Sequence, residues 1–184
     1  MKCPSTIHTT LILEAIQYYS KLGYQLLDVP QCVDFNISQH TKPEGVPELF
    51  HRGMKVYVAS AEQSFLQLHK EGKLPNGKYM ALTPCYRQES FLDDTHYSMF
   101  LKLELFELLC MDSFPMMCDA HDFFRKYLPP NSRYVPTKEA ECSYDIETED
   151  GVEVGSYGVR YTLDGTPYTY GTGIAEPRFS SLIK

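Results

Sequence analysis

The sequence has 184 residues, which is enough for one good hydrophobic core and too few for a comfortable second domain. Its 43% hydrophobic and 22% charged residues are ordinary for a globular protein, and no apolar run is long enough to span a bilayer, which excludes a membrane-spanning protein. The net charge of −7 argues against DNA or another large nucleic-acid partner, although a local basic groove remains compatible with it.

The N-terminal stretch and the cysteines both indicate a cytoplasmic protein. MKCPSTIHTTLILEAI has one lysine and an apolar run broken by Glu14, a poor signal peptide. The six cysteines are scattered, with no C-x-x-C pair and no paired spacing with histidine. Free thiols in a reducing compartment are therefore favoured over a zinc site or a disulfide framework.

The first predicted elements are a helix and a short strand. Residues 10–22 place apolar side chains on one face at helical spacing, and Gly23 follows as a left-handed C-cap. A strand at 24–29 ends at Pro30. Residues 33–56 are polar and contain two prolines and two glycines, so we expect an irregular loop there.

A second helix and two strands follow. Residues 60–72 are predicted to be helical, with Ser60 as the N-cap. Residues 80–89 form a strand, SFLDDT forms a loop, and a further strand begins at His96. These strands are expected to pair through the loop.

The C-terminal half is predicted to contain a helix, a strand meander and a last short helix. Residues 113–128 can form a helix that stops at two prolines. The strands ECSYDIETE, VEVGSYGVRYTL and PYTYGT are separated by Asp-Gly turns, and a helix starts at Glu176 or Pro177. We predict an α+β fold in which an antiparallel sheet is flanked by helices packed on one side, in a single domain over residues 1–184.

Charged side chains interrupt the two strands around the SFLDDT loop. From Met99 onward, alternate residues are apolar and face the core, whereas the other face carries charged and aromatic groups. The charged face combines Arg87, Glu89, His96, Phe100, Lys102 and Glu104. Arginine suits phosphate or carboxylate and an aromatic ring can stack on a base, so the pattern indicates a nucleotide site, with a solvated ion-pair face as the alternative.

Three motifs in order resemble those of the class II aminoacyl-tRNA synthetases. The R-x-E, loop and H-x-x-x-F of residues 80–109 resemble motif 2, and FLKLELF is similar to the equivalent strand of the seryl enzymes. The helix, strand and Pro30 of residues 10–30 fit motif 1, and TYGTGIAEPR in residues 169–183 fits motif 3. The closest subclass is that of the seryl, threonyl, prolyl and glycyl enzymes.

The resemblance implies an ATP site. Arg87 and Arg178 would be the catalytic arginines, with Arg87 on the α-phosphate and Arg178 on the γ-phosphate and near the adenine. Glu89 would contact the adenine edge, Phe100 would stack on the ring, and His96 would touch the γ-phosphate. No general base is required, because the attacking carboxylate is already ionised.

The resemblance also implies metal and amino-acid ligands. GVEVGSYGVR resembles the strand of the family that holds Mg²⁺, with Glu153 and Ser156 as its ligands; an exposed acidic edge is the alternative. Strict alternation separates these two residues, so a β-bulge near Gly155 is required. Glu62 would take the α-amino group of the amino acid, unless it serves only in the first turn of a capped helix, and Glu104 and Thr169 would line the side-chain pocket.

The sequence departs from the family in the features that bind tRNA. We find no room for a tRNA-recognition domain, and the motif 2 loop is short and acidic, which is unfavourable beside phosphates. The favoured function is ATP-dependent activation of an amino acid, with tRNA, a carrier protein, a protein lysine or ammonia as the acceptor. A non-catalytic paralogue that binds an amino acid or nucleotide and regulates a partner is the alternative, and an RNA-binding module is the weakest. Motif 1 implies a homodimer.

Overall fold

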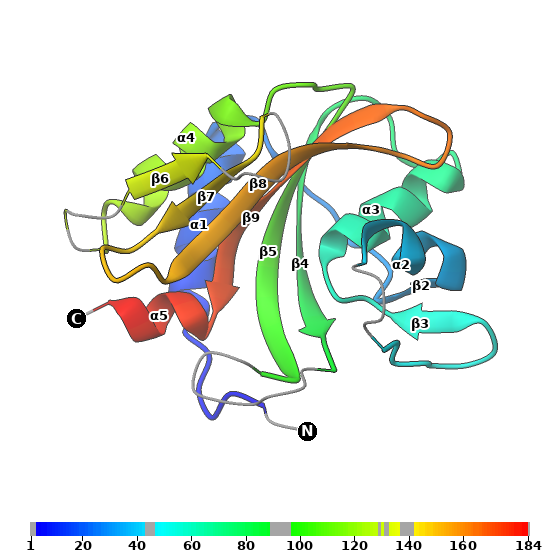
Figure 1. Ribbon diagram of the computed structural model, residues 1–184, viewed down its shortest axis with the longest axis horizontal. Coiled ribbons are helices and arrows are strands. Elements are labelled where there is room, and N and C mark those ends of the chain that lie inside the picture. Colours follow the sequence, from blue (N-terminus) through cyan, green and yellow to red (C-terminus); the bar gives the residue numbers. More distant parts are fainter. Residues whose placement is uncertain are drawn as a thin grey trace.

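The computed structural model describes residues 3–42, 47–88, 97–128, 130, 133–136 and 142–183, with 133–136 described by their backbone (Figure 1). The fold is α+β. The helices are α1 (Thr9–Lys21), α2 (Phe35–Thr41), α3 (Ala61–Lys70), α4 (Phe114–Phe124) and α5 (Arg178–Leu182). The strands are β1 (Gln25–Leu26), β2 (Cys32–Asp34), β3 (Lys55–Tyr57), β4 (Lys78–Tyr86), β5 (Met99–Leu108), β6 (Arg133–Pro136), β7 (Tyr144–Glu147), β8 (Glu153–Tyr161) and β9 (Pro167–Glu176).

Seven strands form one sheet in the order β1-β4-β5-β9-β8-β7-β6, and β2 and β3 form a separate small sheet. The expected hairpin is confirmed: β4 and β5 pair antiparallel from Lys78 opposite Glu107 to Tyr86 opposite Met99. The expected meander is also confirmed, since β7, β8 and β9 pair antiparallel in turn. The short edge strand β1 is parallel to β4, so the sheet is mixed rather than purely antiparallel.

Periodicity and capping residues in the sequence predicted the positions of most of the helices correctly. α1 and α3 match the predicted helices, Gly23 has φ +90° after α1, and the Ser60 hydroxyl accepts a hydrogen bond from the Glu62 backbone N–H at the start of α3. The predicted loop at 33–56 is wrong, because it contains the whole of α2 and most of β2 and β3. These elements are too short to show periodicity, and burial of Val33, Ile37 and Val56 against α3 holds them.

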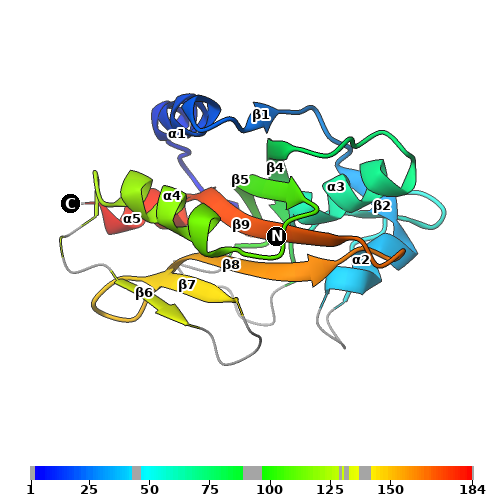
Figure 2. The same ribbon diagram turned by 90° about the horizontal axis from the view of Figure 1, so that it is seen from above.

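Helices cover both faces of the sheet, not one face as expected. On one face, α1 and α4 enclose a core that includes Leu103, Leu105 and Ile174. On the opposite face α3 covers only one end, where Phe65 stacks on Phe106 with ring centroids 4.8 Å apart. Figure 2 shows from above that α3 lies towards one end of the molecule and α4 towards the other, and the cavities described below lie over the part of the second face that α3 leaves uncovered.

Two bulges adjust which residues face this open part of the sheet. Glu147 pairs with Glu153 and Ile146 with Gly155, so Val154 is an extra residue in β8. Glu104 pairs with Thr172 and Leu103 with Ile174, so Gly173 is an extra residue in β9. A β-bulge changes the direction of side chains along a strand and is common next to functional sites.

Within the described ranges, no helix combines the length and apolar character needed to cross a membrane.

Candidate active site

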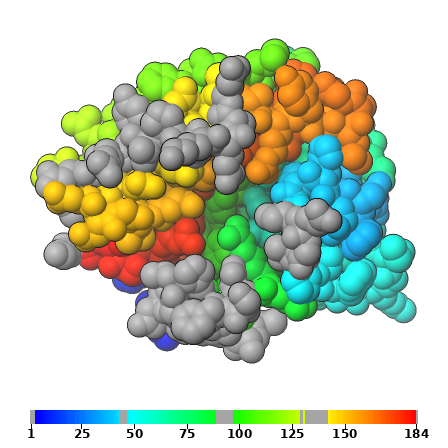
Figure 3. All heavy atoms as spheres, viewed as in Figure 1, coloured from blue at the N-terminus to red at the C-terminus, as the bar shows by residue number. Residues whose placement is uncertain are grey.

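Two adjoining cavities lie over β4, β5, β8 and β9. In the space-filling view the green atoms of β4 and β5 are set between the yellow, orange and red elements on one side and the blue and cyan elements on the other (Figure 3). The outer cavity lies beside α5, and the inner cavity, of about 360 Å³, extends towards α3. Both are lined by Arg87, Lys102, Glu153 and Thr172, so they form one continuous site.

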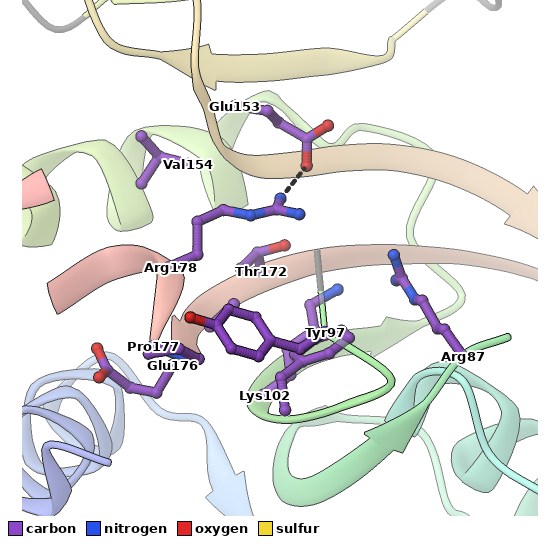
Figure 4. A pocket seen from close by; sticks show the side chains of 11 residues that line it. Arg87, Tyr97, Lys102, Glu153, Val154, Thr172, Glu176, Pro177 and Arg178 are labelled. Atoms are coloured by element: carbon purple, nitrogen blue, oxygen red, sulfur yellow. Dashed lines mark hydrogen bonds and ion pairs between the residues drawn. The ribbon is translucent and has the colours of Figure 1, made fainter. Parts of the chain in front are cut away.

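The outer cavity brings together the two arginines expected to bind ATP. Arg87 follows β4, and its guanidinium lies 5.0 Å from the centroid of the Phe100 ring on β5. Arg178 begins α5, and its Nη1 lies 3.4 Å from Oε1 of Glu153 (Figure 4). Figure 4 shows the two arginines on opposite sides of the cavity, with Lys102 and Thr172 between them. The cavity therefore offers two separated cations and an aromatic face.

Glu104 forms part of the wall of the inner cavity. It is completely buried; Nζ of Lys102 donates to its Oε1 at 3.0 Å and lies 2.9 Å from its Oε2. The Ser60 hydroxyl, at the start of α3, also donates to Glu104, at 2.6 Å. A buried carboxylate needs such partners, and here they hold the side chain in one orientation at the cavity wall.

Glu62 lies at the inner end and is already bonded to two side chains. Nη1 of Arg160 donates to its two oxygens at 2.9 and 2.8 Å, and the Tyr168 hydroxyl donates to Oε1 at 2.8 Å. Burial raises the pKa of Glu62, and the neighbouring Arg160 offsets part of that increase. For Arg160, burial alone would lower the pKa, but the ion pair with Glu62 raises it above its ordinary value. The two groups therefore form an ion pair in which the carboxylate is buried and the guanidinium is partly exposed.

Glu153 and Ser156 both line the inner cavity, as the expected bulge requires. The extra residue is Val154, immediately before the glycine at which the bulge was expected. The pair supplies one carboxylate and one hydroxyl, hard oxygen donors of the kind that Mg²⁺ accepts alongside phosphates and water. Among the described residues, no group of three or more His, Cys, Asp or Glu side chains could hold a metal ion without such additional ligands.

The other predicted site residues have different outcomes. Glu89 and His96 lie outside the described residues. Thr169 does not line either cavity, and its buried Oγ1 has no hydrogen-bond partner within the described part of the chain. Alternation explains this correction: Tyr170 and Thr172 face the inner cavity, so Thr169 faces the opposite side of β9.

Arg160 and Tyr170 are cavity residues that the motif comparison missed. They line the inner cavity, and the Arg160 guanidinium lies 4.2 Å from the Tyr170 ring centroid. The signal for Arg160 was present in the sequence, because alternation along β8 places it on the same face as Ser156. Tyr170 was not predicted to line the cavity, because its neighbour Thr169 was assigned to the cavity face instead.

Solved structures that share this fold include aminoacyl-tRNA synthetases. Seryl-tRNA synthetase from Pyrococcus horikoshii, complexed with ATP, superposes with a TM-score of 0.79 at 18% identity, over 95% of this chain and 49% of that one. The cytoplasmic serine-tRNA ligase from Naegleria fowleri, in complex with AMP, gives 0.74 at 17% identity, over 95% and 52%. The pyrrolysyl-tRNA synthetase PylSc from Desulfitobacterium hafniense gives 0.74 at 13% identity, over 96% and 70%.

The chain has the fold of the class II aminoacyl-tRNA synthetase catalytic core. It spans about half the length of the two seryl enzymes. No protein-family model matches the sequence, and no curated protein matches it. The similarity to these synthetases is therefore a similarity of fold.

Proposed function

We propose that this chain activates an amino acid with ATP and forms an aminoacyl-adenylate. The observation that supports this most directly is the continuous site in which Arg87, Phe100 and Arg178 lie at one end and Glu62, Glu104 and Arg160 lie at the other. A nucleotide fits the chemistry of the first group and an amino acid that of the second. Fold neighbours complexed with ATP and AMP support the assignment of the nucleotide.

The reaction requires positioning and charge stabilisation. A carboxylate oxygen of the amino acid attacks the α-phosphorus, a new P–O bond forms, and the bond to the β-phosphate oxygen breaks, so that pyrophosphate leaves. The carboxylate is ionised at neutral pH, and no proton has to be removed. Arg87 is proposed to stabilise the charge that develops at the α-phosphate, and Arg178 to hold the γ-phosphate. Phe100 would stack on the adenine, and Glu89 and His96 complete the proposed ATP ligands.

Magnesium is proposed to bind beside the phosphates. Glu153 and Ser156 would hold it, with the remaining ligands supplied by ATP and water. Bound Mg²⁺ would neutralise phosphate charge. Because Glu153 is paired with Arg178 in this structure, binding of the metal at Glu153 would free that guanidinium for a phosphate.

The amino acid is proposed to bind in the inner cavity with its α-carboxylate towards Arg87. Glu104 lies within that cavity and can accept the α-ammonium group while it keeps its bonds to Lys102 and Ser60. Glu62, the carboxylate expected to take this group, is instead paired with Arg160 and also accepts a hydrogen bond from Tyr168. The adenylate would then pass to an acceptor, with tRNA one candidate among several.

The test is amino-acid-dependent exchange between ATP and pyrophosphate, run with each of the twenty amino acids. We expect exchange with at least one, and a loss of about 100-fold or more in Arg87→Ala and Arg178→Ala, because each removes a charge-stabilising contact. Arg125→Ala is the matched control, since this exposed arginine lies at the end of α4. Nucleotide binding without exchange for any amino acid would instead support the non-catalytic paralogue.

A further inference from the structure

Arg160 lines the inner cavity and has donors with no partner in the described part of the chain. Its side chain is 40% exposed, although Glu62, its partner, is almost completely buried. Only Nη1 contacts Glu62. Among the described residues, Nε and Nη2 have no hydrogen-bond partner, so one edge of the guanidinium remains available to a ligand.

Two groups hold this guanidinium in position. Glu62 binds Nη1 from α3, and the Tyr170 ring supports the guanidinium at 4.2 Å. Tyr170 in turn lies over Gly158, where an added Cβ would stand 2.7 Å from the Tyr170 hydroxyl. Gly158 therefore leaves space for the Tyr170 ring, which contacts the Arg160 guanidinium. A guanidinium held in one plane loses less entropy when it binds a planar group.

The charges around Arg160 favour a carboxylate over other side-chain ends. Glu62 is paired with Arg160, so it leaves no unpaired negative charge for an ammonium group at the end of a substrate side chain. A cationic side chain would meet Arg160 and Lys102. A carboxylate matches two parallel N–H donors, the geometry that the Nε–Nη2 edge offers.

We propose that the inner cavity selects an amino acid whose side chain ends in a carboxylate, that Arg160 binds this group, and that Glu62 is a positioning residue for Arg160. This inference rests on the proposed activation of an amino acid, because it names the substrate class for the same site. Under this proposal Glu62 positions Arg160 and does not receive the α-amino group of the substrate.

Binding measurements test the inference separately from activation. Isothermal titration calorimetry with aspartate, glutamate and glutarate, compared with glutamine, is run on the full chain. We expect at least one dicarboxylate to bind about 10- to 100-fold more tightly than glutamine, as charged hydrogen bonds imply. Arg160→Met should remove that preference, and Arg125→Met on α4 should leave it unchanged.

A second variant controls for the possibility that Arg160→Met fails to fold. Arg160→Met leaves Glu62 buried without its cation, which is destabilising. The double variant Arg160→Met with Glu62→Gln removes both charges, and Tyr168 can still donate to residue 62. This variant should fold and lack the preference for a dicarboxylate. Glu62→Gln alone should raise the KM for the acidic amino acid more than the KM for ATP.

The outcomes separate the two proposals. Exchange with a neutral or basic amino acid, unchanged in the double variant, would overturn the inference and leave activation standing. Selective dicarboxylate binding without any exchange would support Arg160 as the recognition residue and contradict activation. Equal binding of glutamate and glutamine would overturn the inference. A uniform loss of affinity for all amino acids in Glu62→Gln would restore the role of Glu62 at the α-amino group.

Discussion

Gly171 on β9 has no room for a side chain. An added Cβ would stand 2.3 Å from Cδ1 of Tyr157 and 2.9 Å from Sδ of Met116, both in the buried core. Neither neighbour can withdraw easily, because the Tyr157 hydroxyl donates to the Thr172 carbonyl at 2.7 Å. We expect Gly171→Ala to lower the free energy of unfolding by roughly 1–3 kcal/mol through overpacking, measured by urea denaturation.

A double-mutant cycle isolates that contact. Tyr157→Val removes the ring that the new methyl group would meet, at the cost of a cavity of its own. The double variant should therefore be more stable than the sum of the two single effects implies. Additive losses would show that the glycine is required for some reason other than the ring.

At the residue scale, alternation predicted the site well where a strand is regular. Phe100, Lys102 and Glu104 line the site as the pattern in β5 implies. Thr169 was misplaced because the motif was matched by residue type rather than by strand face. Arg160 could have been found from the face that it shares with Ser156, but its ion pair with Glu62 joins residues 98 positions apart, which no local pattern reveals.

At the scale of elements, Asp34 connects the small sheet to α3. Its Oδ1 lies 2.7 Å from Nζ of Lys55 on β3, and its Oδ2 lies 2.9 Å from Nζ of Lys70 on α3. The Gln67 side chain also accepts a hydrogen bond from the Asp34 backbone N–H. The hydrogen bonds from Lys55 and Lys70 lower the pKa of Asp34 well below its ordinary value.

Removal of this carboxylate should change stability in a pH-dependent way. A lowered folded-state pKa means that the stabilisation is present above the unfolded-state pKa and is lost as pH falls through the folded-state value. Asp34→Asn should therefore cost about 1 kcal/mol or less at pH 7, because solvent screens a partly exposed pair. The difference from the wild type should shrink as pH falls below about 4.

Thermal unfolding between pH 2 and pH 7 measures this effect. Asp28→Asn is the control, at an exposed position earlier in the chain, and it should leave the curve unchanged. A difference between Asp34→Asn and the wild type that is constant with pH would mean that the carboxylate charge is not what joins the two elements.

Elements held only by tertiary contacts could not be predicted from the sequence. β2, α2 and β3 have 3, 7 and 3 residues, too few for a clear period. They form because Val33, Ile37 and Val56 are buried against α3, a contact between distant parts of the chain. The longer elements α1, α3, β5 and β9 carry their own periodicity and caps, and the sequence predicted them.

At the scale of the whole molecule, an apolar surface runs over α1 and the residues that follow it. Leu13, Leu22 and Leu26 are 57%, 38% and 50% exposed, and Leu82 on the neighbouring β4 is 38% exposed. β1 is an edge strand of the sheet, and α1 lies next to it (Figure 2). Contiguous exposed apolar groups favour association, which supports the homodimer that motif 1 implies.

Sedimentation equilibrium at micromolar concentration tests this prediction. We expect a dimer for the wild type and a monomer for Leu13→Glu with Leu26→Glu, because charge at the centre of an apolar interface costs several kcal/mol unless it is paired. Met54→Glu is the matched control, since this residue is 68% exposed and precedes β3. A wild-type monomer under these conditions would contradict the prediction.

The two bulges make this site sensitive to the length of its strands. Val154 is the extra residue that lets Glu153 and Ser156 line one cavity, and Gly173 is the extra residue beyond Thr172. Insertion of one residue between Gly155 and Ser156 would keep both of these side chains in the sequence but would turn them to opposite faces of the sheet. Single-residue insertions and deletions in β8 and β9 are therefore the mutations most disruptive to this site. The number of residues between two side chains on a strand determines whether both face the ligand.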